Sequence, residues 1–321
     1  MNGFSLLKNT NAYKVFSLDV SRGTASHAYL IVCEDELNLE NYLKAFAKRL
    51  LCSESEPCGV CRNCTLIESK THTDVVFYPT GKKILVADVD DLVKKSAYKP
   101  LECDKKVFIL NGVSNMLPQA QNKLLKTLEE PPKNTYLLLG ATSTYTVLST
   151  VLSRCKRLDI PSFKEEDIVK ALEGECLDRQ KLLSAVRLSG GKLGEARERY
   201  ESGAGALAEE LAIKTFIEVT SSRDVARFSG KVTKELLKDY ISSLARLTGL
   251  ALRLQDHFES GDGAFYETAL NLSKTLNKGA LIHASDAVRK AEKDVYFNAT
   301  ATAVVDGVVF SILEGKHKWL K

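Results

Sequence analysis

The alternation of two kinds of segment over the first 160 residues constrains the fold of this chain most. Five short apolar runs recur, at 28–33, 74–78, 107–110, 136–141 and 157–160. Between them, apolar residues follow helical spacing, as in Leu117, Ala120, Leu124 and Leu128. Runs that are apolar throughout are typical of strands buried on both faces of a parallel sheet, and strand–helix alternation is typical of α/β domains. The sequence therefore predicts a parallel sheet flanked by helices.

The pattern changes after Pro161, beyond which no strand is expected. Residues 164–200 favour short helices, and from about residue 206 the spacing is helical throughout, as in Leu236, Tyr240, Leu244, Leu247, Ala251 and Leu254. A length of 321 residues is enough for two or three domains. We predict an α/β domain over 1–163, a small helical domain over 164–205 and an all-α domain over 206–321.

Charge and hydropathy exclude some classes of protein. The chain has 45 basic and 41 acidic residues, a net charge of +4, which is too small to indicate nucleic-acid binding by itself. No apolar stretch reaches the roughly 18 residues of a membrane span, and residues 1–13 lack the features of a secretory signal. We expect a cytoplasmic protein without membrane association.

Four of the eight cysteines gather within thirteen residues, as Cys52, Cys58, Cys61 and Cys64. The spacing C-x5-C-x2-C-x2-C brings three thiolates around one point and adds a fourth from just upstream. Four thiolates satisfy a tetrahedral zinc ion and leave it no open position. We predict a structural zinc site without catalytic activity, in a module over residues 52–64.

Three other interpretations of the cysteine cluster stay open at this point. A disulfide is disfavoured in the cytoplasm. A C-x2-C redox motif normally opens a helix in a thioredoxin-like unit, which this pattern does not resemble. An iron–sulfur cluster also uses four cysteines, although usually with wider or more regular spacing.

The connection after the first apolar run lacks a phosphate-binding loop. In many nucleotide-binding α/β domains this strand leads into G-x-x-x-x-G-K-[ST], whose glycines and lysine bind phosphates. Residues 34–42 contain neither glycine nor lysine, and include the acidic Glu34, Asp35, Glu36 and Glu40. Acidic side chains suit a helix N-terminus but repel a triphosphate.

The acidic residue that an ATPase uses to hold magnesium is also missing from its expected position. It normally follows a later strand. The candidate strand at 107–110 is followed by Asn111, Gly112, Val113 and Ser114. Two separate requirements are thus unmet, and we predict a chain that neither binds nor hydrolyses ATP.

Residues 105–163 resemble the core of a bacterial clamp-loader subunit of the AAA+ family. NKLLKTLEEPP at 122–132 and SRC at 153–155 are the most specific parts, and SHAYL at 26–30 and CGVCRNC at 58–64 fit as well. Within that family the gamma/tau subunits share the cysteine module and the SRC triplet but keep the phosphate loop. The chain therefore resembles the delta-prime group of the DNA polymerase III clamp loader.

The resemblance implies an AAA+ module with a zinc insertion, a helical lid and a helical collar. It implies a hetero-pentamer with gamma/tau and delta subunits, which opens the sliding clamp and places it on primed DNA. It gives Arg154, within Ser153-Arg154-Cys155, a role at the ATP site of an adjacent subunit. The place of a nucleotide-contacting arginine in the lid of active relatives is taken here by Gly194.

Two other functions remain to be separated from this one. The chain could be an active ATPase of the gamma/tau kind that binds nucleotide through a degenerate loop, which measurable ATP binding would favour. It could also be a zinc-dependent DNA-binding module, which tight, salt-sensitive DNA binding would favour. A non-catalytic assembly subunit predicts neither behaviour for the isolated chain.

Overall fold

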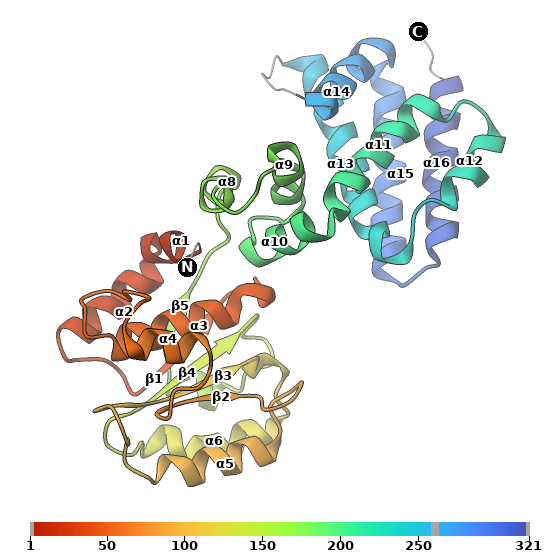
Figure 1. The fold of residues 1–321 in the computed structure, drawn as a ribbon. Helices are drawn as coiled ribbons and strands as arrows, with labels where there is room; N and C mark the ends of the chain where they lie inside the picture. Colours follow the sequence, from red (N-terminus) through yellow and green to blue (C-terminus); the bar gives the residue numbers. More distant parts are fainter. Residues whose placement is uncertain (1–2, 258–262, 319–321) are drawn as a thin grey trace. The chain divides into compact units, whose positions relative to one another are not determined.

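The computed structural model describes residues 3–257 and 263–318, and its contacts divide the chain into two compact units (Figure 1). The first joins residues up to Glu175 with Gly190–Glu195, and the second joins Cys176–Ser189 with residues from Ala196 onward. Helix α10 (Leu193–Ser202) begins in the first unit and continues into the second.

The first unit is built on a five-stranded sheet in the order β2-β3-β4-β1-β5, in which all neighbours pair in parallel. The strands are β1 (Ala28–Val32), β2 (Val75–Tyr78), β3 (Lys106–Asn111), β4 (Thr135–Ala141) and β5 (Lys156–Asp159). Each lies within one or two residues of an apolar run in the sequence. The predicted parallel sheet with flanking helices is therefore confirmed.

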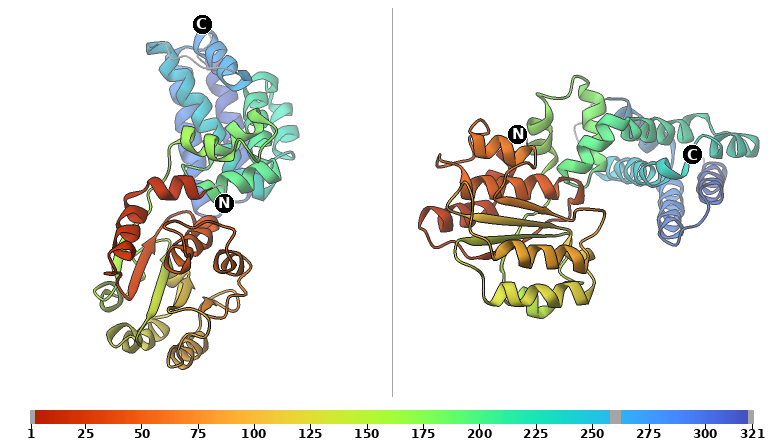
Figure 2. Two further views of the ribbon diagram at one scale, coloured as in Figure 1. Left: turned by 60° about the vertical axis from the view of Figure 1, so that its left-hand side comes forward. Right: turned by 60° about the horizontal axis from the view of Figure 1, so that its bottom comes forward.

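Helices cover both faces of the sheet, which makes three layers (Figure 2). One face packs against α1 (Phe4–Asn9), α2 (Asn11–Ser21), α3 (Glu36–Leu51) and α4 (Arg62–Glu68), and the other against α5 (Val86–Ser96), α6 (Pro118–Glu129) and α7 (Ser149–Leu152). Along β1 the side chains alternate, so Tyr29 and Ile31 join the first core and Ala28 and Leu30 the second. Burial on both faces explains why this strand is apolar throughout.

Two short elements complete the first unit. A 3-10 turn, η1 (Val113–Asn115), follows β3, and α8 (Glu165–Leu172) follows β5 and buries Ile168 and Leu172. Helix α10, which begins in this unit at Leu193, comes next. It follows Gly190 and Gly191, whose backbones are in the left-handed region.

The described residues of the second unit form helices joined by turns and loops, without a strand. It comprises α9 (Arg179–Leu188), the rest of α10, α11 (Ala204–Glu218), α12 (Ser222–Ser229), α13 (Lys234–Asp256), α14 (Gly263–Thr275), α15 (Lys278–Tyr296) and α16 (Ala301–Lys318). The central helix α13 is capped by the Thr233 side chain and buries Tyr240, Leu244, Leu247 and Ala251, as the helical spacing predicts.

The predicted boundary at 163–164 falls between β5 and α8, and the predicted small domain over 164–205 corresponds to α8, α9 and α10. Contacts assign α8 to the first unit and α9 to the second, so the three-domain division stays a prediction. Within the described residues, no helix combines the length and the apolar character that a bilayer crossing needs.

Candidate functional site

The connection from β1 to α3 is where nucleotide-binding α/β domains carry their phosphate loop. Here β1 ends at Val32 and α3 begins at Glu36, so residues 33–35 alone join them. A phosphate loop needs a longer, glycine-containing connection whose backbone N–H groups surround the phosphates. This short connection leaves no backbone with which to form one.

Asp35 occupies the space in front of α3. Asp35 is only 4% exposed. Its Oδ2 accepts a hydrogen bond of 2.8 Å from the backbone N–H of Gly194. Asp35 is the N-cap residue of α3, and Gly194 lies in the first turn of α10. One carboxylate therefore lies at the N-termini of two helices, where the helix dipoles favour a negative charge.

Burial raises the pKa of Asp35, and the backbone N–H groups of Gly194 and Asn38 act in the opposite direction. Burial has the larger effect, so the pKa of Asp35 lies above its ordinary value. The N–H of Gly194 donates to Oδ2, whereas Oδ1 is buried without a hydrogen-bond partner among the described residues. The carboxylate is part of the chain, so it needs no ligand to complete the contact with Gly194.

Glycine is required at position 194 for this packing. A Cβ there would lie 2.7 Å from Asp35 Oδ1, 2.8 Å from the backbone nitrogen of Asn38 and 2.8 Å from Leu37 Cβ. Two of these three neighbours belong to the backbone or the first side-chain atom of α3, which cannot rotate away. An arginine, which the resemblance expects at this position in active relatives, does not fit in this arrangement.

A cavity of about 310 Å³ lies at the carboxyl edge of the sheet. Asn111 at the end of β3 and Thr142 after β4 line it, together with Glu36 and Glu40 from α3. The strand β3 therefore presents an amide there, as the sequence predicts, and no carboxylate. Glu40 is paired with Lys70 at 2.7 Å and lies near Lys44, so its charge is already matched.

Arg154 follows α7 and precedes β5, and its side chain is 34% exposed. Its Nη1 donates to the carbonyl oxygen of Thr150 at 2.9 Å and to Ser153 Oγ at 3.3 Å. Its Nη2 lies 2.6 Å from Glu129 Oε1, in an ion pair. The guanidinium is thus held at the surface by its own helix and by the end of α6.

The other two members of the triplet have local roles. Ser153 is the C-cap of α7, and its Oγ donates to the carbonyl oxygen of Thr150 at 3.1 Å. Burial raises the pKa of Cys155 to about 12, so its thiol stays protonated and unreactive at neutral pH. The three residues therefore form one compact turn that presents Arg154.

Helix α6 fixes the turn that carries Arg154 from both ends. At its start the fully buried Gln121 accepts a hydrogen bond from the N–H of Leu148, the N-cap of α7, at 2.8 Å. The same amide donates to the carbonyl oxygens of Thr146 at 2.9 Å and Met116 at 3.2 Å. At the end of α6, Glu129 pairs with Arg154.

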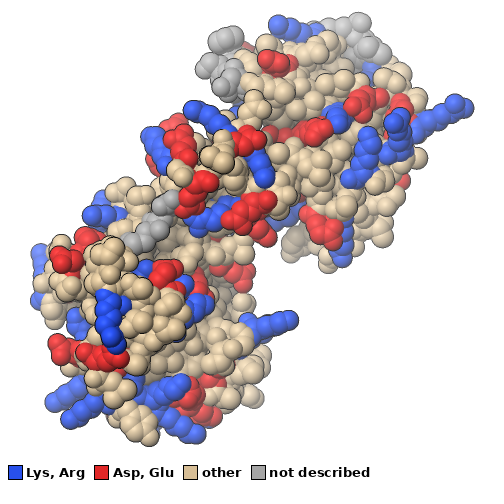
Figure 3. All heavy atoms as spheres, viewed as in Figure 1, with Lys and Arg blue, Asp and Glu red and all other residues tan. Residues whose placement is uncertain are grey.

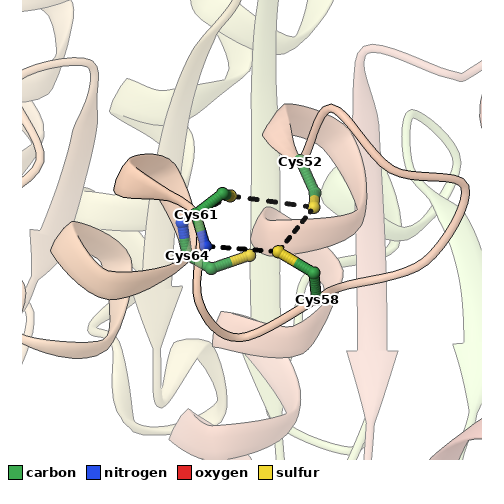
Figure 4. A group of neighbouring side chains, drawn as sticks. All are labelled: Cys52, Cys58, Cys61 and Cys64. Carbon is green, nitrogen blue, oxygen red and sulfur yellow. Dashed lines mark hydrogen bonds between the residues drawn. The ribbon is translucent and has the colours of Figure 1, made fainter.

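The four clustered cysteines come together as predicted (Figure 4). Cys52 follows α3, Cys58 and Cys61 lie in the loop, and Cys64 lies in α4. All four Sγ atoms lie within 4.8 Å of one another, and Cys52 Sγ is 3.6 Å from that of Cys58 and 3.8 Å from that of Cys61. Zinc–sulfur bonds of 2.3 Å in a tetrahedron imply sulfur separations of about 3.8 Å. The cluster can therefore hold a metal ion.

Backbone N–H groups donate to two of the four sulfur atoms. The N–H of Cys61 donates to Cys58 Sγ at 3.3 Å, and that of Cys64 to Cys61 Sγ at 3.5 Å. The N–H groups of Cys61 and Val60 lower the pKa of Cys58 to about 6. Burial raises the pKa of Cys64 to about 12. A cation at the centre would compensate the burial of the fourth thiolate.

Asp74, beside the cysteine module, has a structural role that the sequence does not reveal. Its carboxylate is fully buried and accepts hydrogen bonds from the N–H groups of Leu101 at 2.7 Å, Glu102 at 2.7 Å and Cys103 at 2.9 Å. Burial alone would raise the pKa of Asp74, but these donors outweigh it, so the pKa lies below its ordinary value. The contact fastens the segment before β3 to the start of β2.

On the face drawn in Figure 3, basic and acidic side chains are interspersed over both units. This distribution agrees with the nearly balanced composition. The visible face therefore lacks the broad basic surface that is typical of sequence-independent DNA binding.

The chain is similar in sequence to known subunits of DNA polymerase III. The family model described as "DNA polymerase III, delta subunit" matches residues 8–164. The chain is 31% identical to the delta-prime subunit of DNA polymerase III from Haemophilus influenzae over 60% of this chain and 60% of that protein. It is 30% identical to the delta-prime subunit from Bacillus subtilis over 59% of this chain and 57% of that protein. The chain is thus similar to delta-prime subunits of the DNA polymerase III clamp loader.

The matched stretches cover about three fifths of these delta-prime relatives. The tau subunit of DNA polymerase III from Escherichia coli is 32% identical over 48% of this chain and 24% of its own length. The chain is thus similar to clamp-loader subunits of both kinds over part of its length.

Sequence reasoning missed the partners of the residues that it singled out. Arg154 was predicted, but Glu129 and Gln121 were not. The segment between α6 and α7, which includes β4, decides which of these residues meet. The acidic 34–42 segment was noted, whereas the contact of Asp35 with Gly194 joins residues 159 positions apart. The EEPP motif contains two glutamates, Glu129 and Glu130. Nothing in the sequence indicates which of them pairs with Arg154.

Proposed function

We propose that this chain is a non-catalytic stator subunit of the bacterial DNA polymerase III clamp loader. It binds no nucleotide, helps ATP-driven loading of the sliding clamp onto primed DNA, and donates Arg154 in trans to a neighbouring ATPase subunit. It works in the cytoplasm as part of the replisome.

The observation that supports this proposal is the buried carboxylate of Asp35 at the N-terminus of α3. Asp35 lies where a phosphate would meet the N-terminus of α3, and it is held there by Gly194. A triphosphate would have to displace a buried carboxylate of its own charge and would find no loop to surround it. In a nucleotide-binding protein, a bound nucleotide could connect these two helix ends. Here the hydrogen bond between Asp35 and Gly194 connects α3 to the start of α10.

The second part of the proposal rests on the exposure and support of Arg154. A guanidinium placed against a γ-phosphate stabilises the negative charge that spreads over the phosphate oxygens during transfer. An arginine supplied in trans raises hydrolysis by about 10³–10⁵ in the best-known systems. Arg154 is partly exposed and is held at two sides, so it is available to a neighbour without rearrangement of the fold.

The partners follow from this role. The chain assembles with gamma/tau and delta subunits in a hetero-pentamer, and it meets the sliding clamp and primed DNA through that complex. Zinc bound by Cys52, Cys58, Cys61 and Cys64 stabilises the local structure of the module and takes no part in a reaction, because four thiolates fill its coordination.

The experiment is the replacement Arg154→Ala in a reconstituted clamp loader. We expect assembly of the complex to be unchanged. The rate of clamp loading should fall at least about 10-fold, because the guanidinium no longer stabilises the transition state of ATP hydrolysis. Arg157→Ala is the matched control. Arg157 lies three residues away on β5, is exposed, and pairs with Asp159 within its own strand.

Loading that is unchanged by Arg154→Ala would refute the arginine donation. Failure of the complex to assemble would do so as well, because Arg154 would then be an interface residue. If Arg157→Ala lowers the loading rate equally, the effect belongs to the local surface charge and the donation is again refuted.

A further inference from the structure

The ion pair between Arg154 and Glu129 deepens the proposed function and rests on it. Arg154 Nη2 lies 2.6 Å from Glu129 Oε1, and the Glu129 side chain is 50% exposed. An exposed pair of this kind contributes little to the stability of a fold. Its effect on the position of the guanidinium is a separate matter, because an arginine side chain is long and has many rotamers.

An unrestrained arginine would have to lose its rotamer freedom when it meets a phosphate in a neighbouring subunit. That loss opposes the contact, and a side chain already fixed in the required place avoids it. Here the guanidinium is fixed from two elements: Thr150 holds Nη1 from α7, and Glu129 holds Nη2 from α6.

The support behind Glu129 is itself rigid. Glu129 is the last residue of α6, whose other end is joined to the N-cap of α7 through the buried Gln121. Leu124 and Leu128 of the same helix are buried in the core beneath the sheet. The position of the Glu129 backbone is therefore set by the core of the first unit.

The pair also leaves the arginine able to bind an anion. Among the described residues, the Nε–H donor of Arg154 makes no hydrogen bond, because the contacts of the guanidinium go through Nη1 and Nη2. A guanidinium has five N–H donors, so donors remain for a phosphate oxygen while the pair with Glu129 is kept.

We propose that Glu129 is a positioning residue for Arg154: its carboxylate holds the guanidinium in the place from which it reaches the ATP site of the adjacent subunit. Glu129 touches no nucleotide itself. The neighbouring Glu130 does not share this role, because it is exposed and makes no ion pair among the described residues.

The test compares four chains in the reconstituted clamp loader, with clamp, primed DNA and varied ATP. These are the unmodified chain, Glu129→Ala, Arg154→Ala and the double variant. Glu130→Ala is the matched control, and thermal unfolding checks that each chain is folded. Without Glu129, Arg154 must lose its rotamer freedom when it meets the phosphate. Glu129→Ala should therefore lower the loading rate at saturating ATP by about 3- to 10-fold. The ATP concentration for half-maximal rate should stay unchanged.

The double variant decides whether Glu129 acts through Arg154. We expect it to load clamps no more slowly than Arg154→Ala alone, because there is nothing left to position. An equal further loss in the double variant would overturn the proposal, and so would an unchanged or increased rate for Glu129→Ala alone. If Arg154→Ala itself has no effect, the proposed function fails first, which distinguishes the two failures.

Discussion

The contact between Asp35 and Gly194 gives a prediction for the replacement Gly194→Ala. The added methyl group would lie 2.7 Å from Asp35 Oδ1 and 2.8 Å from the backbone nitrogen of Asn38. The carboxylate can rotate, but the nitrogen of Asn38 is part of α3 and cannot. Segment 190–195 must therefore move away, and the 2.8 Å hydrogen bond to Asp35 is lost.

Three contributions set the size of the effect. Alanine is favoured over glycine in a helix by up to about 1 kcal/mol. Overpacking costs about 1–3 kcal/mol, and the lost hydrogen bond to a charged acceptor about 1.5–3 kcal/mol. The two costs do not add in full. Either the segment keeps the hydrogen bond and is overpacked, or it moves away and the hydrogen bond is lost. We expect the contact to be weakened by about 2 kcal/mol, or roughly 30-fold in its opening equilibrium.

Hydrogen exchange of the backbone amide at position 194 measures that equilibrium directly, and exchange should become about 30-fold faster in the variant. The control is Gly174→Ala, which lies in the same unit at a position where an added Cβ has nothing within 4 Å. Its exchange at position 194 should match that of the unmodified chain.

Exchange that is unchanged by Gly194→Ala would refute the account of this contact. It would mean that the amide at 194 is protected by something other than Asp35. An equal acceleration in Gly174→Ala would refute it as well, since the effect would then be a general loosening of the unit.

Three further predictions concern stability. Asp74→Ala leaves three backbone N–H groups without their acceptor and should lower the free energy of unfolding by about 3 kcal/mol in denaturant titration. Because the pKa of Asp74 is lowered in the folded state, its contribution is complete above the unfolded pKa near 4 and should fade as pH drops below it. Gln121→Ala should cost about 2–4 kcal/mol by the same assay, since a fully buried amide with three partners is lost. Removing metal from the cysteine module should unfold residues 52–64 locally, seen as faster proteolysis there, and intact thermal stability with the metal gone would contradict a structural role.

The sheet could be predicted from the sequence because burial on both faces leaves a plain signal. Leu30 and Ile31 point to opposite cores, and both must be apolar. The edge strand β5 was the hardest case, since of its four residues only Leu158 is buried. It is nevertheless found where the RLDI run predicts it, paired with β1.

The site was predictable residue by residue, but its contacts were not. The cysteine spacing fixes its own geometry, because the four ligands lie within one short segment. Arg154 and Glu129 meet only because α6 and α7 pack together, and Asp35 meets Gly194 only because the chain returns after α9. Contacts between distant segments depend on the whole fold, and spacing along the sequence carries no record of them.

The central claim is that this chain binds no nucleotide, and an ATP titration of the purified chain tests it most directly. The titration is made by calorimetry with and without magnesium. The account predicts no binding up to millimolar ATP in either condition, because the N-terminus of α3 already holds the buried carboxylate of Asp35 and has no phosphate loop before it. Micromolar binding would contradict it. The contact of Asp35 with Gly194 would then have to open for ATP, and the chain would be an ATPase candidate in its own right.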